Sequence, residues 1–256
     1  KLPSGIFIDG AFHPSQSGAT FETKNPYDGV IIGTLPACDV ADVDRAVASA
    51  RAAFESGVWS DLHPTERKEI LTDFAALILE NTQELAVMEA LDAGKPIADC
   101  LEIDIPETAA CIRWHAEAQD KLYDQIAPSS PDGLGLIVRE PIGVVAAVLP
   151  WNFPLMMMAW KIGPALATGN CVVVKPAEDT SLTALRLAEL AVQAGVPAGV
   201  LNVVTGMGLD VGAPLGRHMD VDALTFTGST ATGRLFLEYA AQSNMKEVSL
   251  EMGGKS

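Results

Sequence analysis

Residues that could do chemistry follow five short apolar runs in the second half of the sequence. The five groups are Pro150-Trp151-Asn152, Lys175 to Glu178, Gly206 to Gly208, Gly228 to Thr230, and Glu251 to Gly254. Asn152 stands between two prolines and two aromatic residues in PWNFP. Such a segment is either simply a rigid turn, where asparagine is common, or a turn whose rigidity holds the asparagine amide in place as an oxyanion donor. The residues alone favour neither explanation.

Lys175 and Glu178 stand directly after an apolar run in VVVKPAE. A lysine and a glutamate at this spacing most often form a solvated surface pair. At the carboxyl end of a buried parallel strand, however, a carboxylate can accept hydrogen bonds from ribose hydroxyls. The same carboxylate would repel a 2′-phosphate, which favours NAD over NADP as the ligand.

Two glycine-rich segments are weaker signals. GMGLDVG (206–212) is one residue too long for the dinucleotide fingerprint, and a flexible turn containing Gly208 is at least as good an explanation. GSTATG (228–233) has P-loop spacing, but Arg234 follows where a lysine is required, which disfavours an ATPase. Ser229 and Thr230 still fit the start of a helix, where capping and phosphate contact can coexist.

The elements that must position these residues alternate between short apolar runs and helical patterns. Expected strands cover residues 144–149, 171–175, 201–205, 223–227 and 247–251, and expected helices cover 155–167, 181–194, 209–218 and 230–241. This alternation predicts an α/β fold with a doubly wound, Rossmann-like parallel sheet. The five groups then lie at the carboxyl edge of one sheet, where such folds bind ligands.

The first half of the chain has a different pattern. IFIDGAFHPS predicts an opening hairpin. Helical periodicity follows, with expected helices around residues 43–54, 70–78, 83–93 and 106–123. Residues 124–141 then hold two extended segments around a Ser-Pro-Asp-Gly turn, which predicts an arm suited to contact with a partner.

Composition restricts the function further. The 256 residues carry a formal charge of −16, so nucleic acid and anionic membranes are disfavoured as partners. No apolar run approaches the length of a bilayer span, and no leader pattern opens the chain.

The four cysteines form no CxxC pair and the histidines no cluster, which predicts free thiols in a reducing cytoplasm and no metal site. Cys171, at the start of a strand, is expected to be a core residue. YxxxK and GxSxG are absent, which argues against short-chain dehydrogenases and serine hydrolases.

Several long motifs occur together in one order: PWNFPLMMMAWKIGPALATGN, VVVKPAE, FTGSTATG and LEMGGKS. In this combination the chain resembles the aldehyde dehydrogenase superfamily over essentially its whole length. LDAGKPI and IRWHAEAQDKLYDQIAPSS are most similar to enzymes that act on γ-glutamyl-γ-aminobutyraldehyde and related ω-amino aldehydes.

The resemblance implies an organisation and a set of roles. Residues 1–123 and 142–256 would form the NAD-binding domain, and 124–141 a β-hairpin oligomerisation arm that builds homodimers or homotetramers. Asn152 would stabilise an oxyanion, Glu251 would be the general base, with Met252 in place of the family's leucine, and Lys161 would relay protons. The implied NAD contacts are Pro150, Trp151, Lys175, Glu178, Gly208, Gly228, Ser229 and Gly253.

The reaction that the resemblance implies oxidises an aldehyde to a carboxylic acid through a cysteine thioester, with NAD as hydride acceptor. The family's nucleophilic cysteine lies some thirty residues beyond the glutamate motif, and none of the four cysteines matches that position. The catalytic domain is therefore expected to be absent from this chain, which we interpret as a fragment. The alternatives are a catalytically inactive NAD-binding module or an interaction protein.

Overall fold

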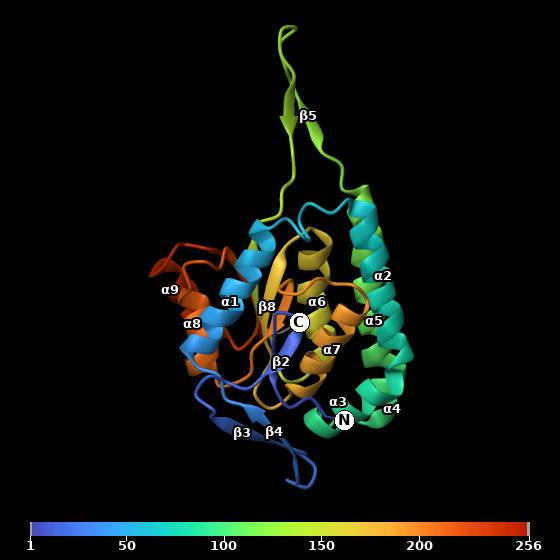
Figure 1. The fold of residues 1–256 in the computed structure, drawn as a ribbon, viewed down its shortest axis with the longest axis vertical. Helices are drawn as coiled ribbons and strands as arrows, with labels where there is room; N and C mark the ends of the chain where they lie inside the picture. Colours follow the sequence, from blue (N-terminus) through green and yellow to red (C-terminus); the bar gives the residue numbers. More distant parts are fainter. Residues whose placement is uncertain (1, 255–256) are drawn as a thin grey trace.

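In the computed structural model, which describes residues 2–254, a seven-stranded sheet runs through the centre of the molecule (Figure 1). The strand order is β11-β10-β7-β8-β9-β1-β2. The strands are β1 (Ile6–Ile8), β2 (Ala11–His13), β7 (Val144–Val148), β8 (Cys171–Lys175), β9 (Leu201–Val203), β10 (Ala223–Gly228) and β11 (Glu247–Met252). The last five are parallel to one another, which confirms the doubly wound α/β prediction. β1 and β2 add the predicted opening hairpin antiparallel to the edge at β9.

Helices cover both faces of the sheet because its central strands are apolar on both sides. Every residue of β7 and β8 is buried. On one face lie α6 (Pro154–Ala167) and α7 (Leu182–Gln193), and on the other α1 (Val40–Glu55), α8 (Ala213–Arg217) and α9 (Thr230–Ala241). Parallel connections that place helices on both faces create a switch point between β7 and β10, where ligands bind in such folds.

An outer helical layer packs on α6 and α7. It comprises α2 (Pro64–Glu80), α3 (Thr82–Ala93), α4 (Ile97–Asp99), the π-helical turn η1 (Cys100–Asp104), α5 (Ile105–Ala118) and a short 3₁₀ turn, η2 (Gln119–Lys121). α3 ends at Gly94, whose φ of 71° is left-handed, as the sequence predicted. Trp59 is fully buried beneath this layer, and its ring N–H donates to the carbonyl of Leu166 at 3.0 Å.

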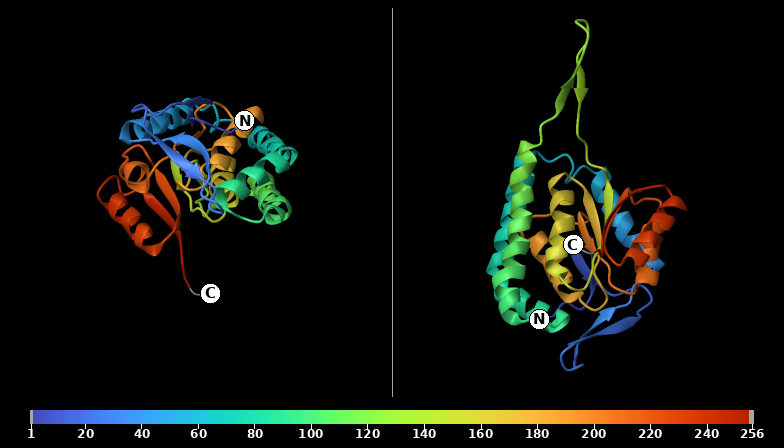
Figure 2. Two further views of the ribbon diagram at one scale, coloured as in Figure 1. Left: turned by 90° about the horizontal axis from the view of Figure 1, so that it is seen from below. Right: turned by 180° about the vertical axis from the view of Figure 1, so that it is seen from behind.

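Two hairpins lie outside the main sheet. β5 (Gln125–Ala127) and β6 (Gly135–Ile137) pair in an arm that projects away from the body of the molecule (Figures 1 and 2). At the opposite end, β3 (Thr20–Lys24) and β4 (Ile31–Pro36) form a hairpin that the sequence analysis did not anticipate.

Within residues 2–254 no helix combines the length and the apolar character that crossing a membrane requires.

Two helix predictions were inaccurate. α5 ends at Ala118 and tightens into the 3₁₀ turn, so the helix stops short of the predicted Tyr123. The expected helix over 209–218 is instead a π-helical turn, η3 (Gly208–Gly212), followed by α8. Pro214 explains the second difference, because proline lacks the N–H of the regular ladder and crowds the carbonyl four residues earlier.

Gly206 shows that the first glycine of GMGLDVG is a steric requirement of the turn after β9. Its φ is +138°, and an added Cβ would lie 2.9 Å from Val211 Cγ2 and 3.2 Å from the backbone nitrogen of Cys38. Gly208 is different, because a Cβ there would meet nothing within 4 Å. The spacing of this segment therefore reflects chain packing as well as access to the sheet edge.

We predict that Gly206→Ala lowers the free energy of unfolding by about 1–3 kcal/mol, because alanine is strained at positive φ and the contacts leave no room for its methyl group. Urea denaturation measures the change. The matched control is Gly208→Ala, which should leave the free energy unchanged or raise it by up to about 1 kcal/mol. Equal effects of the two substitutions would contradict the steric explanation.

Candidate active site

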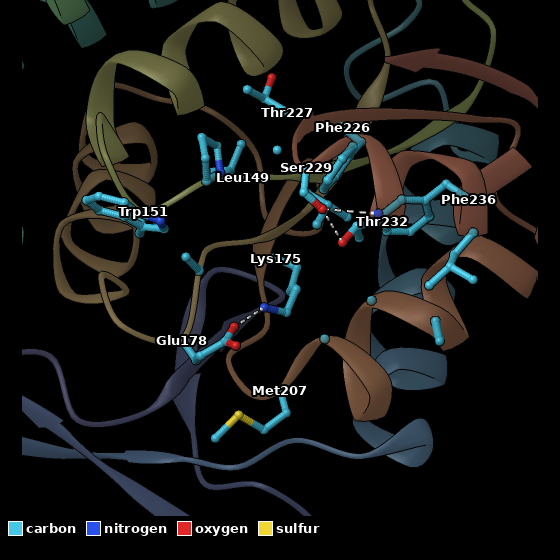
Figure 3. A pocket seen from close by; sticks show the side chains of 18 of the residues that line it. Leu149, Trp151, Lys175, Glu178, Met207, Phe226, Thr227, Ser229, Thr232 and Phe236 are labelled. Carbon is cyan, nitrogen blue, oxygen red and sulfur yellow. Dashed lines mark hydrogen bonds and ion pairs between the residues drawn. The ribbon is translucent and has the colours of Figure 1, made fainter. Parts of the chain in front are cut away.

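The polar groups predicted from the strand ends meet around one cavity of about 1110 Å³ (Figure 3). The cavity lies beyond the carboxyl ends of the parallel strands. Of the predicted site residues, those that line it are Pro150, Trp151, Asn152, Lys175, Glu178, Gly208, Gly228, Ser229, Glu251 and Gly253. Lys161 is not in the wall, but it contacts the cavity through Glu251. Residues more than 100 positions apart are thus brought to one place by strand order alone.

Lys175 and Glu178 form the most buried ion pair of the cavity wall. Lys175 is 2% exposed, and its Nζ lies 3.0 Å from Glu178 Oε2 and donates to the Pro176 carbonyl at 3.0 Å. Burial by itself raises the pKa of Glu178, but the charge and hydrogen bond of Lys175 outweigh burial and hold that pKa below its ordinary value. Glu178 is therefore an ionised acceptor that faces the cavity (Figure 3).

Ser229 caps the N-terminus of α9. Its hydroxyl accepts a hydrogen bond from the Thr232 N–H at 3.1 Å and lies 2.9 Å from Thr232 Oγ1 (Figure 3). The capping explanation is therefore correct. Since Ser229 also lines the cavity, the first N–H groups of α9 and the positive end of its dipole lie at the cavity wall. Such a helix start is suited to a phosphate.

Glu251 is held from two sides. Its Oε1 lies 3.3 Å from Lys161 Nζ, and its Oε2 accepts a hydrogen bond from Thr227 Oγ1 at 3.3 Å. The Lys161 side chain is 5% exposed, whereas that of Glu251 is 50% exposed. A buried cation thus orients a carboxylate that water can reach, which is the arrangement that a general base needs.

Thr227 was missed by the sequence analysis. It precedes the GST segment and pairs in register with Glu251 across β10 and β11. The signal that could have identified Thr227 is the register of β10 against β11, and a single sequence does not give that register directly.

Asn152 lies between the end of β7 and the start of α6. It is exposed to the cavity, and the next residue, Phe153, is the N-cap of α6. The Phe153 carbonyl accepts the hydrogen bond of the Met157 N–H at 2.9 Å. The amide is therefore presented to the cavity from the junction between a buried strand and a helix, and its role as an oxyanion donor stays a prediction.

One wall of the cavity is apolar and was not predicted. Phe226 and Phe236 pack with ring centroids 5.0 Å apart, and Tyr239 packs edge-on against Phe236 at 5.9 Å. Met207 and Leu209 also line the cavity, and Leu209 is 77% exposed. These side chains offer a planar ring an apolar contact surface.

The four cysteines contribute nothing to the cavity wall. Burial raises the pKa of Cys171 to about 12, and this residue is fully buried in β8, as the sequence analysis predicted. Burial likewise raises the pKa of Cys38 to about 12 and the pKa values of Cys100 and Cys111 to about 11. Across residues 2–254, no group of three or more His, Cys, Asp or Glu side chains is arranged to hold a metal ion.

Residues 12–256 match the aldehyde dehydrogenase family. The chain belongs to this family. An aminoacetaldehyde dehydrogenase of Pseudomonas aeruginosa is 60% identical over 255 residues, which are 100% of this chain and 51% of that protein. The NADP/NAD-dependent aldehyde dehydrogenase PuuC of Escherichia coli is 50% identical over 255 residues, which are 100% of this chain and 52% of that protein. The chain thus spans about half the length of these relatives.

Solved structures confirm the fold of the family member described here. The γ-glutamyl-γ-aminobutyraldehyde dehydrogenase of Burkholderia cenocepacia superposes with a TM-score of 0.98 at 52% identity. The match covers 100% of this chain and 52% of that chain. An indole-3-acetaldehyde dehydrogenase of P. syringae, in complex with NAD⁺, gives a TM-score of 0.99 at 54% identity, with 100% and 52% coverage. The resemblance inferred from the motifs is therefore confirmed.

We predict that the thermal stability of Glu178→Gln approaches that of the unaltered protein as the pH falls. The folded-state pKa of Glu178 is below its ordinary value of 4.5, so its ion pair stabilises the fold above that value and the stabilisation is lost as the pH falls through the folded-state pKa. Calorimetric melting at neutral and at acidic pH measures the difference. A difference that stays constant with pH would show that the pair does not act through ionisation.

Proposed function

We propose that this chain is the cofactor-binding half of an NAD-dependent aldehyde dehydrogenase that oxidises an ω-amino or γ-glutamylamino aldehyde to the carboxylic acid. The observation that carries the proposal is the cavity in which Asn152 and Glu251 share a wall with Lys175, Glu178 and the start of α9. The substrate class rests on relatives named for aminoacetaldehyde and for γ-glutamyl-γ-aminobutyraldehyde.

The cavity fits a dinucleotide by its chemistry. Glu178 is an ionised acceptor for ribose hydroxyls, Ser229 lies at a helix start suited to a pyrophosphate, and the apolar rims accept planar rings. We assign Pro150, Trp151, Lys175, Gly208, Gly228 and Gly253 to the same binding surface. When bound, NAD supplies the acceptor for the hydride that leaves the substrate.

Residues of this chain would stabilise the developing negative charge and transfer protons during the reaction. The Asn152 amide donates to the oxygen that becomes negative when a nucleophile adds to the aldehyde carbonyl. Glu251 then accepts a proton from the water that hydrolyses the acyl group, while Thr227 and Lys161 keep its carboxylate aimed at that water. Lys161 balances the negative charge of Glu251 before that proton arrives, and it would relay the proton onward by giving one of its own ammonium protons to water and then taking the proton from Glu251.

We infer that the nucleophilic cysteine comes from the half of the family's length that this chain does not span. A thiolate is the reactive form of cysteine, and burial raises the pKa of each cysteine in this chain far above neutrality. The free thiols also fit a reducing compartment such as the cytoplasm.

The β5–β6 arm supports assembly with further copies of the chain. It projects from the body, and its apolar side chains are exposed, among them Ile126 at 72% and Leu134 at 71%. Both strands also have an unpaired edge in the two-stranded sheet. We propose that residues 124–141 form an oligomerisation arm and that residues 1–123 and 142–256 form the NAD-binding domain.

We predict that the full-length protein forms NADH with aminoacetaldehyde or γ-glutamyl-γ-aminobutyraldehyde, and that Asn152→Ala lowers kcat by about 10²–10³-fold because an oxyanion donor is lost. NADH absorbance measures the rate. Calorimetric titration with NAD is the control and should give the same Kd for both proteins. NAD binding without turnover of any aldehyde would instead indicate a binding module.

We predict that Glu178→Gln shifts the ratio of kcat/KM for NADP over NAD upward by about tenfold, equivalent to about 1.4 kcal/mol, because a negative charge that repels a 2′-phosphate is removed. The matched control is Glu189→Gln, which alters an exposed partner of Arg186 outside the cavity wall. An unchanged ratio in Glu178→Gln would place the cofactor discrimination elsewhere.

A further inference from the structure

A buried charged cluster lies behind the Asn152 turn, outside the cavity wall. It consists of Glu89 on α3, Lys95 in the loop after α3, and Asp104 at the end of η1. Glu89 is 0% exposed and Asp104 is 1% exposed, while the Lys95 side chain is 17% exposed. None of the roles proposed above uses these three residues.

Lys95 connects the cluster to the active-site turn. Its Nζ pairs with Asp104 Oδ2 on one side. On the other side the same ammonium group lies 3.8 Å from the centroid of the Phe153 ring, the geometry of a cation–π interaction. Because the ammonium group is largely withdrawn from water, this attraction is stronger than it would be at an exposed site.

Glu89 adjusts the charge of the cluster. Burial, and after it the charge of Asp104, raise the pKa of Glu89, while Lys95 opposes both, and the net result is a pKa of about 8. The other ionisable groups that influence this region are Cys100 and Asp99 on η1 and α4. At neutral pH Glu89 therefore keeps its proton, which leaves one carboxylate for one ammonium group.

Phe153 transmits this contact to Asn152. The two residues are adjacent, and the Phe153 carbonyl starts the hydrogen-bond ladder of α6 with Met157 at 2.9 Å. Phe153 is itself 37% exposed, so neighbouring side chains do not enclose its ring completely. The Lys95 ammonium group lies over this ring, and the Asn152 amide is carried by the backbone of the same turn.

A buried charged cluster is seldom explained by stability. Replacing buried ion pairs with apolar residues of similar volume is often neutral or stabilising, because desolvation offsets the attraction. A site that must hold an amide within a fraction of an ångström gains from such a rigid support. The contact of the cluster with Phe153, the residue next to the proposed oxyanion donor, fits that purpose.

We propose that Lys95, paired with Asp104, is a positioning residue that holds the Phe153–Asn152 turn in the geometry needed for oxyanion stabilisation. The inference rests on the proposed aldehyde dehydrogenase function and extends it to residues that touch neither substrate nor cofactor.

The experiment uses the full-length enzyme and compares Lys95→Met, Lys95→Arg and Lys68→Met. The last is the matched control, since Lys68 also pairs with an aspartate, Asp120, but on the surface. kcat is expressed per NAD-binding site from calorimetric titration, so that unfolded protein does not contribute. We expect Lys95→Met to lower kcat about ten- to a hundredfold at unchanged Kd for NAD, and Lys95→Arg to restore most of it.

A double-mutant cycle with Asn152→Ala separates positioning from a general loss of structure. If Lys95 acts through Asn152, Lys95→Met should have little further effect once the amide is gone. Lys95→Met/Asp104→Asn removes both charges of the pair and supplies a measurable protein if Lys95→Met alone fails to fold. The same loss of kcat is expected from it.

The outcomes distinguish the proposed function from the positioning role of Lys95. If the unaltered enzyme oxidises no aldehyde, or Asn152→Ala leaves kcat unchanged, the proposed function fails. Suppose instead that those results are as expected. The positioning role of Lys95 is then wrong if Lys95→Met has the same kcat as Lys68→Met. It is also wrong if Lys95→Met lowers kcat by the same factor with and without Asn152→Ala. A double variant with unchanged kcat per site would overturn it as well.

Discussion

The burial of β7 and β8 on both faces is the constraint on which the remaining architecture depends. Their ten residues are apolar or buried without exception, so two helical layers are required to cover them. Polar side chains can then be placed only where the strands end. Because the five strands β7 to β11 are parallel, their carboxyl ends lie at one edge of the sheet, and the cavity forms there.

That constraint also explains the partners of two buried cations at the edge of the sheet. Lys161 and Lys175 originate inside the fold, yet each reaches a carboxylate that is much more exposed than itself. An ammonium group without hydrogen-bonding partners would be costly to bury. Each lysine orients its carboxylate from inside the fold, while the carboxylates of Glu178 and Glu251 stay open to the cavity. The same ion pair therefore supports the carboxylate and leaves it accessible to a ligand.

The parts of this arrangement that could be predicted from sequence are those encoded locally. Apolar runs such as VVVK predicted the strands, and the residues directly after them predicted the edge of the sheet. Thr227 was missed because its contact with Glu251 depends on the register of adjacent strands. The Lys95–Phe153 contact joins segments 58 positions apart through tertiary packing, and no periodicity encodes it. The β3–β4 hairpin was missed although Asn25-Pro-Tyr-Asp-Gly29, a segment of typical turn residues, connects its two strands.

The inert state of the four cysteines has a consequence for chemical selectivity. Aldehydes are electrophiles that combine with any accessible thiolate, so a stray reactive sulfur near the binding cavity would divert substrate into unproductive adducts. Here desolvation keeps these sulfurs in the thiol form, and none of them faces the cavity. In the enzyme proposed above, this chain would therefore contribute no competitor to the catalytic nucleophile.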